Sequence, residues 1–448
     1  MTLRWTSEQV LALSPDASST KNGKALATVA KWPLLGHSDQ AVWGECKGSG
    51  KNPYRTQIDL REPAFRCSCP SRKFPCKHAL GLFLLLTEQT EAFSADAPPD
   101  WVAEWLEKRS QTTPRKQTKS AKAAADPAAQ AKRAEQRAAK VEAGLADLSQ
   151  WMQDLMRQGL ATLPNQPYSF WDQTAARLVD AQAPGLARRV RALASIPHSG
   201  EGWPDRMLSA LGQLHLLVQS YGRLASLAPD LQAEVRSQIG WPQTQDDLRL
   251  RAEQADPLVV CLSDTWQVLG KVVTEEENLR VQRVWLWGRD HDKAALALSF
   301  AHGRNPLDVS LAPGDCFCGK LIFYPGTGVQ RAFVESREES VSPLFQKDLG
   351  FEQIEAAIVH YAEALSQNPW LGQFPLTLRQ VFPRYYDDAW WLQDAEDRIL
   401  PLSPQFSQGW ELMAVGGGYP LTVFGEWDGA TLIPLSLWTD QQFIPLGE

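Results

Sequence analysis

The sequence has no long hydrophobic run. Its apolar stretches fall far short of the roughly 20 residues that a membrane-spanning helix needs. Residues 1–6 provide neither the basic start nor the apolar segment of a secretory signal peptide. We therefore expect a soluble, cytoplasmic protein. At 448 residues, the chain is long enough for two or three domains with sizeable cores.

The sequence also lacks an excess of positive charge, because its formal net charge is −7. The chain as a whole is therefore not a basic nucleic-acid binder. Its charge is uneven, however. Residues 41–80 hold eight lysines and arginines against three acids, and residues 108–140 hold ten against two. A basic N-terminal third followed by an acidic body permits contact with a polyanion, which can be nucleic acid or an acidic protein face.

Known catalytic motifs are absent as well. The sequence contains no nucleophile elbow, no His-Glu-x-x-His and no kinase signature. The Gly-Ser-Gly-Lys stretch at residues 48–51 is no phosphate-binding loop, because Glu45 and Asn52 stand where that motif needs glycine and serine or threonine. We expect that the protein is not an enzyme, and a hydrolase remains the weakest of the functional alternatives.

The most informative stretch holds three of the seven cysteines and one of the seven histidines: Cys67, Cys69, Cys76 and His78. Thiolate sulfur and imidazole nitrogen are the ligands that Zn²⁺ prefers, and four of them complete a tetrahedron. Residues two positions apart project to the same side of an extended segment. A strand end can therefore supply the first pair, and a turn entering the apolar helix after His78 can supply the second.

This arrangement predicts the ββα layout of a small zinc finger with one structural Zn²⁺. A catalytic zinc is not expected, because four protein ligands leave no position for a reactive water. A disulfide is the main alternative, although thiols are kept reduced in the cytosol. Cys46, upstream, is expected to be a packed thiol, and Cys316 and Cys318 lack a second pair of metal ligands.

The pattern Cys-x-Cys, six residues, Cys-x-His resembles the SWIM zinc finger, whose pattern is Cys-x-Cys, a variable gap and Cys-x-His. All four ligand positions match within residues 67–78, and the similarity extends over residues 30–105. The stretch from Cys69 to His78 looks like those of long bacterial SWIM proteins. The resemblance implies contacts with DNA or protein. For long bacterial members it also implies a link to MoxR-type AAA+ ATPases and von Willebrand A-domain proteins.

We therefore expect a non-enzymatic zinc-binding adaptor that mediates protein–protein contacts. The alternative is a nucleic-acid-binding protein that uses the finger and the basic segment, although such charge runs are more often solvated linkers. The candidate contact residues form a basic rim around the finger: Lys47, Lys51, Arg55, Arg72, Lys73 and Lys77.

The expected fold is a multidomain α+β protein with an N-terminal finger, a central helical bundle and a C-terminal antiparallel β-rich domain. The expected divisions are residues 1–107, a basic linker at 108–140 that grades into an exposed helix, helices at 141–255 and strands at 256–448. His215 lies among leucines, which predicts a core histidine. Residues 409–415 are read as one of the C-terminal strands, with a turn at residues 416–419.

Overall fold

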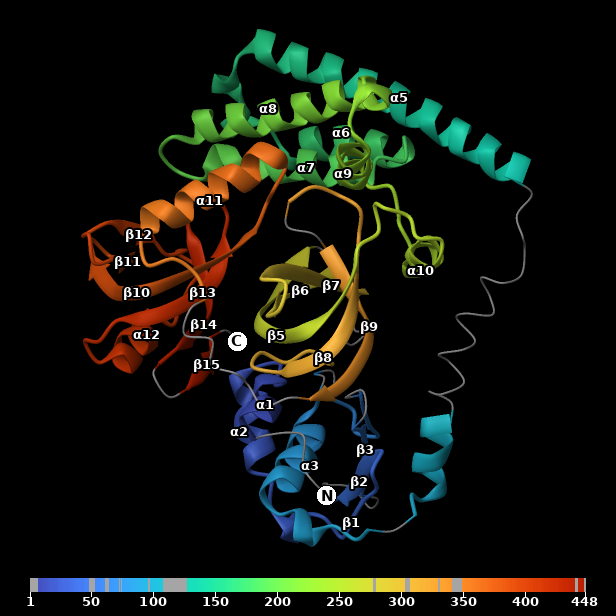
Figure 1. Cartoon of the computed structure of the whole chain (residues 1–448), viewed down its shortest axis with the longest axis vertical. Helices are drawn as coiled ribbons and strands as arrows, with labels where there is room; N and C mark the ends of the chain where they lie inside the picture. Colours follow the sequence, from blue (N-terminus) through green and yellow to red (C-terminus); the bar gives the residue numbers. More distant parts are fainter. Residues whose placement is uncertain are drawn as a thin grey trace.

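The computed structural model describes residues 7–47, 53–60, 64–71, 73, 75–95, 97–107, 127–276, 279–302, 307–328, 331–340, 349–439 and 442–446. It confirms the expected multidomain α+β architecture (Figure 1). A β-barrel lies at the centre, the helical bundle lies above it, the finger domain lies below it and a further sheet lies at the left. None of the described helices is long and apolar enough to cross a membrane.

The N-terminal domain packs one apolar helix, α3, between a sheet and two short helices. The nine residues of α3 from His78 to Leu86 are all buried. Since a helix that is apolar on every side must be covered on every side, the sheet packs against one face and α1 and α2 against another. The elements are α1 (Ser7–Ala12), α2 (Ala17–Lys24), η1 (Val29–Lys31), β1 (Leu34–His37), β2 (Ala41–Cys46), β3 (Tyr54–Asp59), β4 (Ala64–Cys67), α3 (Lys77–Glu88) and η2 (Thr90–Ala92), followed by a helix over residues 100–107. The sheet is antiparallel in the order β1-β2-β3-β4.

The bundle is built around apolar side chains that recur at helical spacing, with Trp171 fully buried at its centre. Its elements are α5 (Pro127–Gln158), η3 (Leu160–Asn165), α6 (Tyr168–Asp180), α7 (Pro184–Ala192), η4 (Leu193–His198), α8 (Trp203–Gly222), η5 (Leu224–Ser226), α9 (Pro229–Ile239) and α10 (Gln245–Glu253). Helix α5 runs unbroken through residue 140, so the expected division between linker and helical domain falls inside a helix.

The expectation that His215 is a core residue is wrong, because its side chain is exposed. The buried face of α8 contains Leu211, Leu214 and Leu217, and His215 follows Leu214 by one residue. One residue turns the chain by about 100° around a helix, which takes His215 off that face. The leucine-rich surroundings in the sequence do not distinguish the two faces.

The β-rich half contains two sheet units. The first is a closed five-stranded barrel in the order β5-β6-β7-β9-β8, in which only β7 and β9 pair in parallel. Its strands are β5 (Cys261–Glu276), β6 (Leu279–Gly288), β7 (Lys293–His302), β8 (Cys316–Phe323) and β9 (Arg331–Ser340). Trp266, Phe317 and Phe323 help to fill its interior core. Closure pairs every strand on both sides, which removes free sheet edges.

The second unit is a six-stranded antiparallel sheet in the order β12-β11-β10-β13-β14-β15. Its elements are α11 (Ile354–Gln367), β10 (Phe374–Tyr386), β11 (Ala389–Gln393), β12 (Ile399–Pro401), α12 (Gly409–Gly416), β13 (Leu421–Trp427), β14 (Leu432–Trp438) and β15 (Phe443–Pro445). The strand expected at residues 409–415 is wrong, because this segment is helix α12. Leu412 is buried on one side of the helix. Gly417 follows the last helical residue and ends the helix with a left-handed φ of +53°. The expected turn at residues 416–419 therefore joins a helix to a strand.

The barrel is joined to its neighbours in different ways. Towards the C-terminal sheet, Arg283 and Trp285 of β6 donate to the buried Glu426 of β13, at 2.9 Å for each arginine contact and 2.7 Å for the indole. Towards the finger domain, Ala312 and Val309 pack into the apolar core around α3. The finger is therefore attached mainly by apolar packing, whereas the C-terminal sheet is also locked by a buried charged network.

Candidate metal centre

The four predicted zinc ligands meet at the point where strand β4 ends and helix α3 begins. Cys67 is the last residue of β4, and Cys69 follows two residues later. Cys76 is the N-cap of α3, and His78 lies in its first turn. The three sulfurs and one imidazole nitrogen all lie within 4.8 Å of one another. The chain thus brings together the strand-end pair and the helix-start pair, as their spacing predicts.

The distances between these atoms fit a tetrahedral zinc site. A Zn–S bond of about 2.3 Å and a Zn–N bond of about 2.0 Å at a tetrahedral angle place the sulfur and the nitrogen roughly 3.5 Å apart, within about half an ångström of the distances found here. Nδ1 of His78 lies 3.8 Å from the sulfur of Cys67 and 4.0 Å from the sulfur of Cys76. The donor set is therefore Cys₃His, with Nδ1 as the histidine donor. The chain therefore carries a zinc-binding domain in which four side chains supply all the ligands of a tetrahedral zinc.

The cluster sits against the core of the finger domain. Cys76 and His78 are buried, whereas Cys67 and Cys69 are partly exposed. The ring of Tyr54 covers His78 with ring centroids 4.9 Å apart, which limits how the imidazole can turn. The hydroxyl of Thr56 lies 3.2 Å from the sulfur of Cys67. A hydroxyl that donates to a ligating thiolate stabilises its charge and fixes its orientation.

Among the four side chains, protons are shared unevenly. Hydrogen bonds from Cys67 and Cys76 hold the pKa of the Cys69 thiol well below its ordinary value. Hydrogen bonding to Cys67 and Cys69 raises the pKa of Cys76, and burial raises it further. Burial alone would lower the pKa of His78, but the sulfurs of Cys67 and Cys69 outweigh that effect and raise it to about 9. Zinc binding requires three thiolates and a neutral imidazole nitrogen, so the metal would displace the protons that these four groups carry.

The residues that sequence analysis missed are those that support the cluster rather than ligate. Thr56 pairs directly with Cys67 across β3 and β4, so its position depends on the strand register. Tyr54 reaches His78 from the same strand. A single sequence does not fix the register of two strands joined by a loop, so no local signal identified either residue.

The basic rim is only partly available for contacts. Arg55 forms an ion pair with Glu45 at 3.1 Å and stacks over Trp101. Lys73 forms an ion pair with Asp16 at 2.5 Å. Lys47 and Lys77 are exposed, and no carboxylate of the described residues forms an ion pair with either. Lys51 and Arg72 lie outside the described residues.

The remaining cysteines do not extend the site. All seven are free, which disfavours the disulfide alternative. Cys46 is fully buried in the apolar core, and burial raises the pKa of its thiol to about 11, as expected for a packed thiol. Within the part of the chain that the structure describes, no other group of three or more histidine, cysteine or acidic side chains is close enough to hold a metal. Cys316 and Cys318 accordingly belong to no such group.

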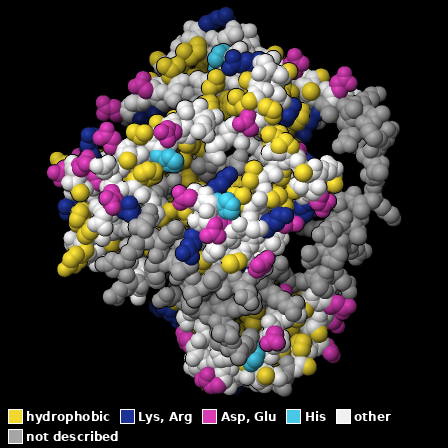
Figure 2. Space-filling view, in the orientation of Figure 1, with side chains coloured by type: hydrophobic (Ala, Val, Ile, Leu, Met, Phe, Trp, Pro, Cys, Tyr) yellow, Lys and Arg dark blue, Asp and Glu magenta, His cyan; other side chains and the backbone are white. Residues whose placement is uncertain are grey.

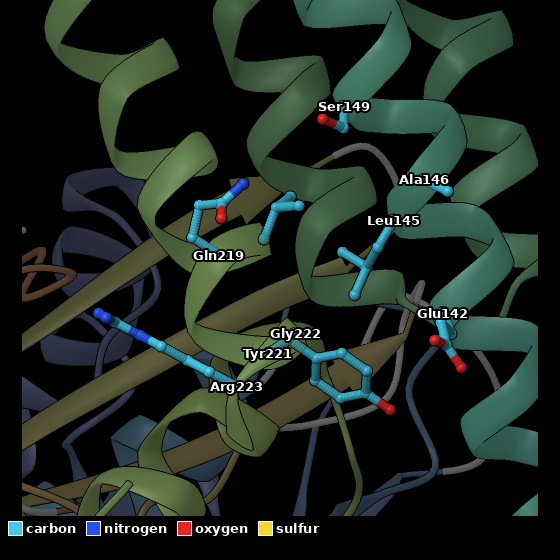
Figure 3. Close-up of a pocket in the computed structure, with 9 residues that line it drawn as sticks. Glu142, Leu145, Ala146, Ser149, Gln219, Tyr221, Gly222 and Arg223 are labelled. Carbon is cyan, nitrogen blue, oxygen red and sulfur yellow. The ribbon is translucent and has the colours of Figure 1, made fainter. Parts of the chain in front are cut away.

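A pocket of about 460 Å³ lies between α5 and the C-terminal end of α8. Figure 3 shows Glu142 and the Tyr221 hydroxyl towards one end of it and Arg223 towards the other. Burial raises the pKa of Tyr221. The lining brings together no nucleophile and base pair, so this pocket offers no catalytic arrangement that would compete with the metal centre as the functional site.

Comparisons with known proteins match two separate segments. The model of the SWIM zinc finger matches residues 54–86, which run from β3 to α3 and include all four cluster residues. The model of the SWIM-associated four-helix bundle domain matches residues 136–239, from α5 to α9. No curated protein and no solved structure matches the chain. The chain therefore contains a SWIM zinc finger together with the four-helix bundle domain that is associated with it.

Proposed function

We propose that this protein is a non-enzymatic adaptor in which one zinc ion shapes the N-terminal domain into a docking surface for another protein. The observation that carries the proposal is the closed set of donors: three sulfurs and one nitrogen within 4.8 Å, with half of the set buried against the domain core. Four protein ligands saturate a tetrahedral zinc, so the ion stabilises structure rather than activating water.

The arrangement of the domains supports an adaptor. The bundle, barrel and C-terminal sheet pack around one another and leave the finger at one end of the molecule (Figure 1). Val309 and Ala312 connect the finger to the barrel, so a partner held by the finger would be held next to the rest of the chain. The absence of catalytic motifs from the sequence is consistent with this role.

The charges around the finger favour protein over nucleic acid. Two of the candidate basic residues, Arg55 and Lys73, are already paired with Glu45 and Asp16. A nucleic-acid surface normally needs several unpaired cations facing the phosphates. Lys47 and Lys77 are exposed, and for this reason nucleic acid is the second candidate partner. In that case, binding to duplex or single strands should fall steeply with salt and should weaken in a Lys47→Glu, Lys77→Glu variant.

Family resemblance suggests a MoxR-type AAA+ ATPase and a von Willebrand A-domain protein as partners. The test is co-purification of the tagged full chain with each of them. The Cys76→Ser variant, which breaks the donor set, should lose association. Cys318→Ser, in the barrel, is the matched control and should retain it. The protein-partner hypothesis fails if the wild type associates with neither protein, and the zinc-dependent docking fails if Cys76→Ser associates as well as the wild type.

A further inference from the structure

A second surface of the molecule exposes aromatic rings. It lies in the C-terminal sheet, where the β10–β11 hairpin meets helix α12. We define the aromatic tip as Tyr385, Tyr386, Trp390 and Trp410. Tyr386 is 75% exposed and Trp410 is 63% exposed. Figure 2 shows hydrophobic side chains at the lower left of this face, where Figure 1 places α12 and its neighbouring strands. Large rings are usually buried in a folded chain, and a group of exposed rings marks an interaction site.

Three of the four rings of the aromatic tip are held in place. Tyr385, Trp390 and Trp410 contact one another, with ring centroids 4.9 to 5.3 Å apart. Helix α12 begins directly against an indole, because a Cβ added at Gly409 would lie 2.1 Å from the ring of Trp390. Only glycine allows this approach. A partner would therefore meet rings that are already ordered, which lowers the entropic cost of binding.

The hairpin turn also fixes the tip. Asp387 and Asp388 have φ values of +52° and +54°, the left-handed pair of a two-residue hairpin turn. The Tyr385 hydroxyl donates to the Asp388 carboxylate at 3.1 Å. The turn thereby places the Asp388 carboxylate beside the Tyr385 ring, and the Asp387 side chain is exposed next to it in the turn. This turn thus contributes both the shape and the charge of the surface.

The charges near the rings are mainly acidic. Asp387, Asp388 and Glu411 are exposed next to the rings in the chain. The nearby cation is Arg384, which donates to Gln393 at 2.6 Å and stacks over Phe382. Faces of tryptophan and tyrosine attract lysine and arginine side chains, and neighbouring carboxylates strengthen that attraction. The same carboxylates repel the phosphates of nucleic acid.

We propose that the aromatic tip binds an extended segment of a partner protein that carries lysine and arginine side chains. The cations of the segment lie over the exposed rings, and Asp387, Asp388 and Glu411 form the acidic rim. The surface is distinct from the finger, because it belongs to the C-terminal sheet and contains no predicted zinc ligand. Binding here is therefore independent of the metal.

The test measures binding to the full chain by calorimetry at low ionic strength. The probe is a 12-residue synthetic peptide that alternates lysine with serine, and its matched control replaces each lysine by glutamate. The wild type should bind the lysine peptide and not the glutamate peptide. Trp410→Ala should weaken binding about fivefold or more, since it removes an exposed ring. Tyr386→Ala, at the solvent-exposed hairpin tip, provides a second variant with little packing to lose.

Tyr168→Ala is the control, because Tyr168 is a tyrosine 55% exposed on the helical bundle, and it should leave affinity unchanged. Asp387→Asn with Asp388→Asn should weaken binding and reduce its salt dependence. The proposal is overturned if the wild type binds neither peptide, if both peptides bind equally, or if neither ring variant changes affinity. It is also overturned if sedimentation shows that the wild type dimerises through this surface and that Trp410→Ala is monomeric, because the occupant is then a second copy.

Discussion

The finger domain and the barrel are stabilised in different ways. The finger sheet has strands of four to six residues, and the segment between Cys67 and Cys76 contains no strand or helix in the residues described there. The barrel has strands of eight to sixteen residues that close on themselves around an apolar interior. Irregular backbone next to a small core needs cross-links, whereas a closed barrel supplies its own pairing. Metal dependence should therefore be confined to the finger.

The two regions also differ in how they are connected to the rest of the chain. Glu426 joins the barrel to the C-terminal sheet by accepting from both Arg283 and Trp285, and its side chain is 2% exposed. The finger meets the barrel through the small apolar side chains of Val309 and Ala312. Loss of order in the finger should therefore spread poorly into the barrel, while damage at Glu426 should affect the barrel and sheet together.

The largest expected effect comes from removing a predicted ligand. Zinc contributes roughly 10–16 kcal/mol to the folding of isolated finger peptides. Here α3 adds its own apolar core, so we expect Cys67→Ala or His78→Ala to loosen the finger without unfolding the chain. Hydrogen exchange should show lost protection in β3, β4 and α3, with protection retained in β5 to β9. Zinc analysis should show loss of the metal.

Cys318→Ser is the control for this experiment, because it removes a thiol from the barrel without touching the cluster. Its exchange pattern and metal content should match those of the wild type. An equal loss of protection in the finger and the barrel of Cys67→Ala would contradict the separation of the two regions. Wild-type protein that contains no zinc when freshly isolated would contradict the metal centre itself.

The next largest effect is expected at the joint between barrel and sheet. Glu426→Ala leaves the Arg283 guanidinium, whose side chain is 13% exposed, without its carboxylate. Removing one partner of a buried ion pair typically costs about 3–5 kcal/mol. Denaturant unfolding should show this loss, and zinc content should remain unchanged. Glu426→Gln keeps one acceptor and should cost less. A loss of zinc in Glu426→Ala would show that the finger and the joint are coupled.

A smaller effect is expected from Thr56→Val, which keeps the shape of the side chain but removes the hydroxyl beside Cys67. Partners of metal ligands typically contribute about 10- to 100-fold to metal affinity. Since one neutral hydroxyl is lost here, we expect about a 10-fold weaker affinity in a competition titration with a chelator. Thr265→Val is the control in the barrel, where Thr265 lies 3.8 Å from the sulfur of Cys318. Equal zinc affinity in Thr56→Val and wild type would remove the proposed role of Thr56.

The same contrast explains what the sequence could predict. The four cluster residues fall within twelve positions, so local spacing and the apolar helix after His78 were enough to bring them together. The α+β class and the order of helical and β-rich regions also followed from local periodicity. Thr56 depended on pairing between two strands, which local spacing does not fix.

Non-local pairing also accounts for the detail of the β-rich half that local patterns did not predict. Its division into a barrel and a sheet depends on β8 pairing with β5 and β10 pairing with β13, contacts between segments far apart in the chain. The run at 409–415 is too short for its apolar pattern to separate strand from helix. The helix is set by Leu412, which packs into the core of the C-terminal sheet, and by the left-handed Gly417 that ends the helix. For His215, the choice of buried face on α8 was set by the neighbouring helices.

The smallest expected effect concerns the loop between the two ligand pairs. Lys73 lies in this loop, and its ion pair with Asp16 ties the loop to the start of α2. The hydrogen bond from Lys73, followed by that from the Ser19 amide, holds the pKa of the Asp16 carboxyl below its ordinary value. A carboxyl group whose pKa is lowered in the folded chain stabilises the fold at pH values above its ordinary pKa. This contribution to stability disappears as the pH falls through the lowered pKa.

Lys73→Met should therefore raise the pKa of Asp16, which an NMR titration of its side chain measures. The value should remain below the ordinary one, because the Ser19 amide still donates to the carboxylate at 2.7 Å. Zinc affinity should change little, since Lys73 does not contact the cluster, and salt should reduce the difference because the pair is exposed. Lys24→Met, in the last turn of α2, is the control. An unchanged Asp16 pKa in Lys73→Met would show that the loop is fixed by its ligands alone, which would make the finger still more dependent on the metal than the barrel comparison implies.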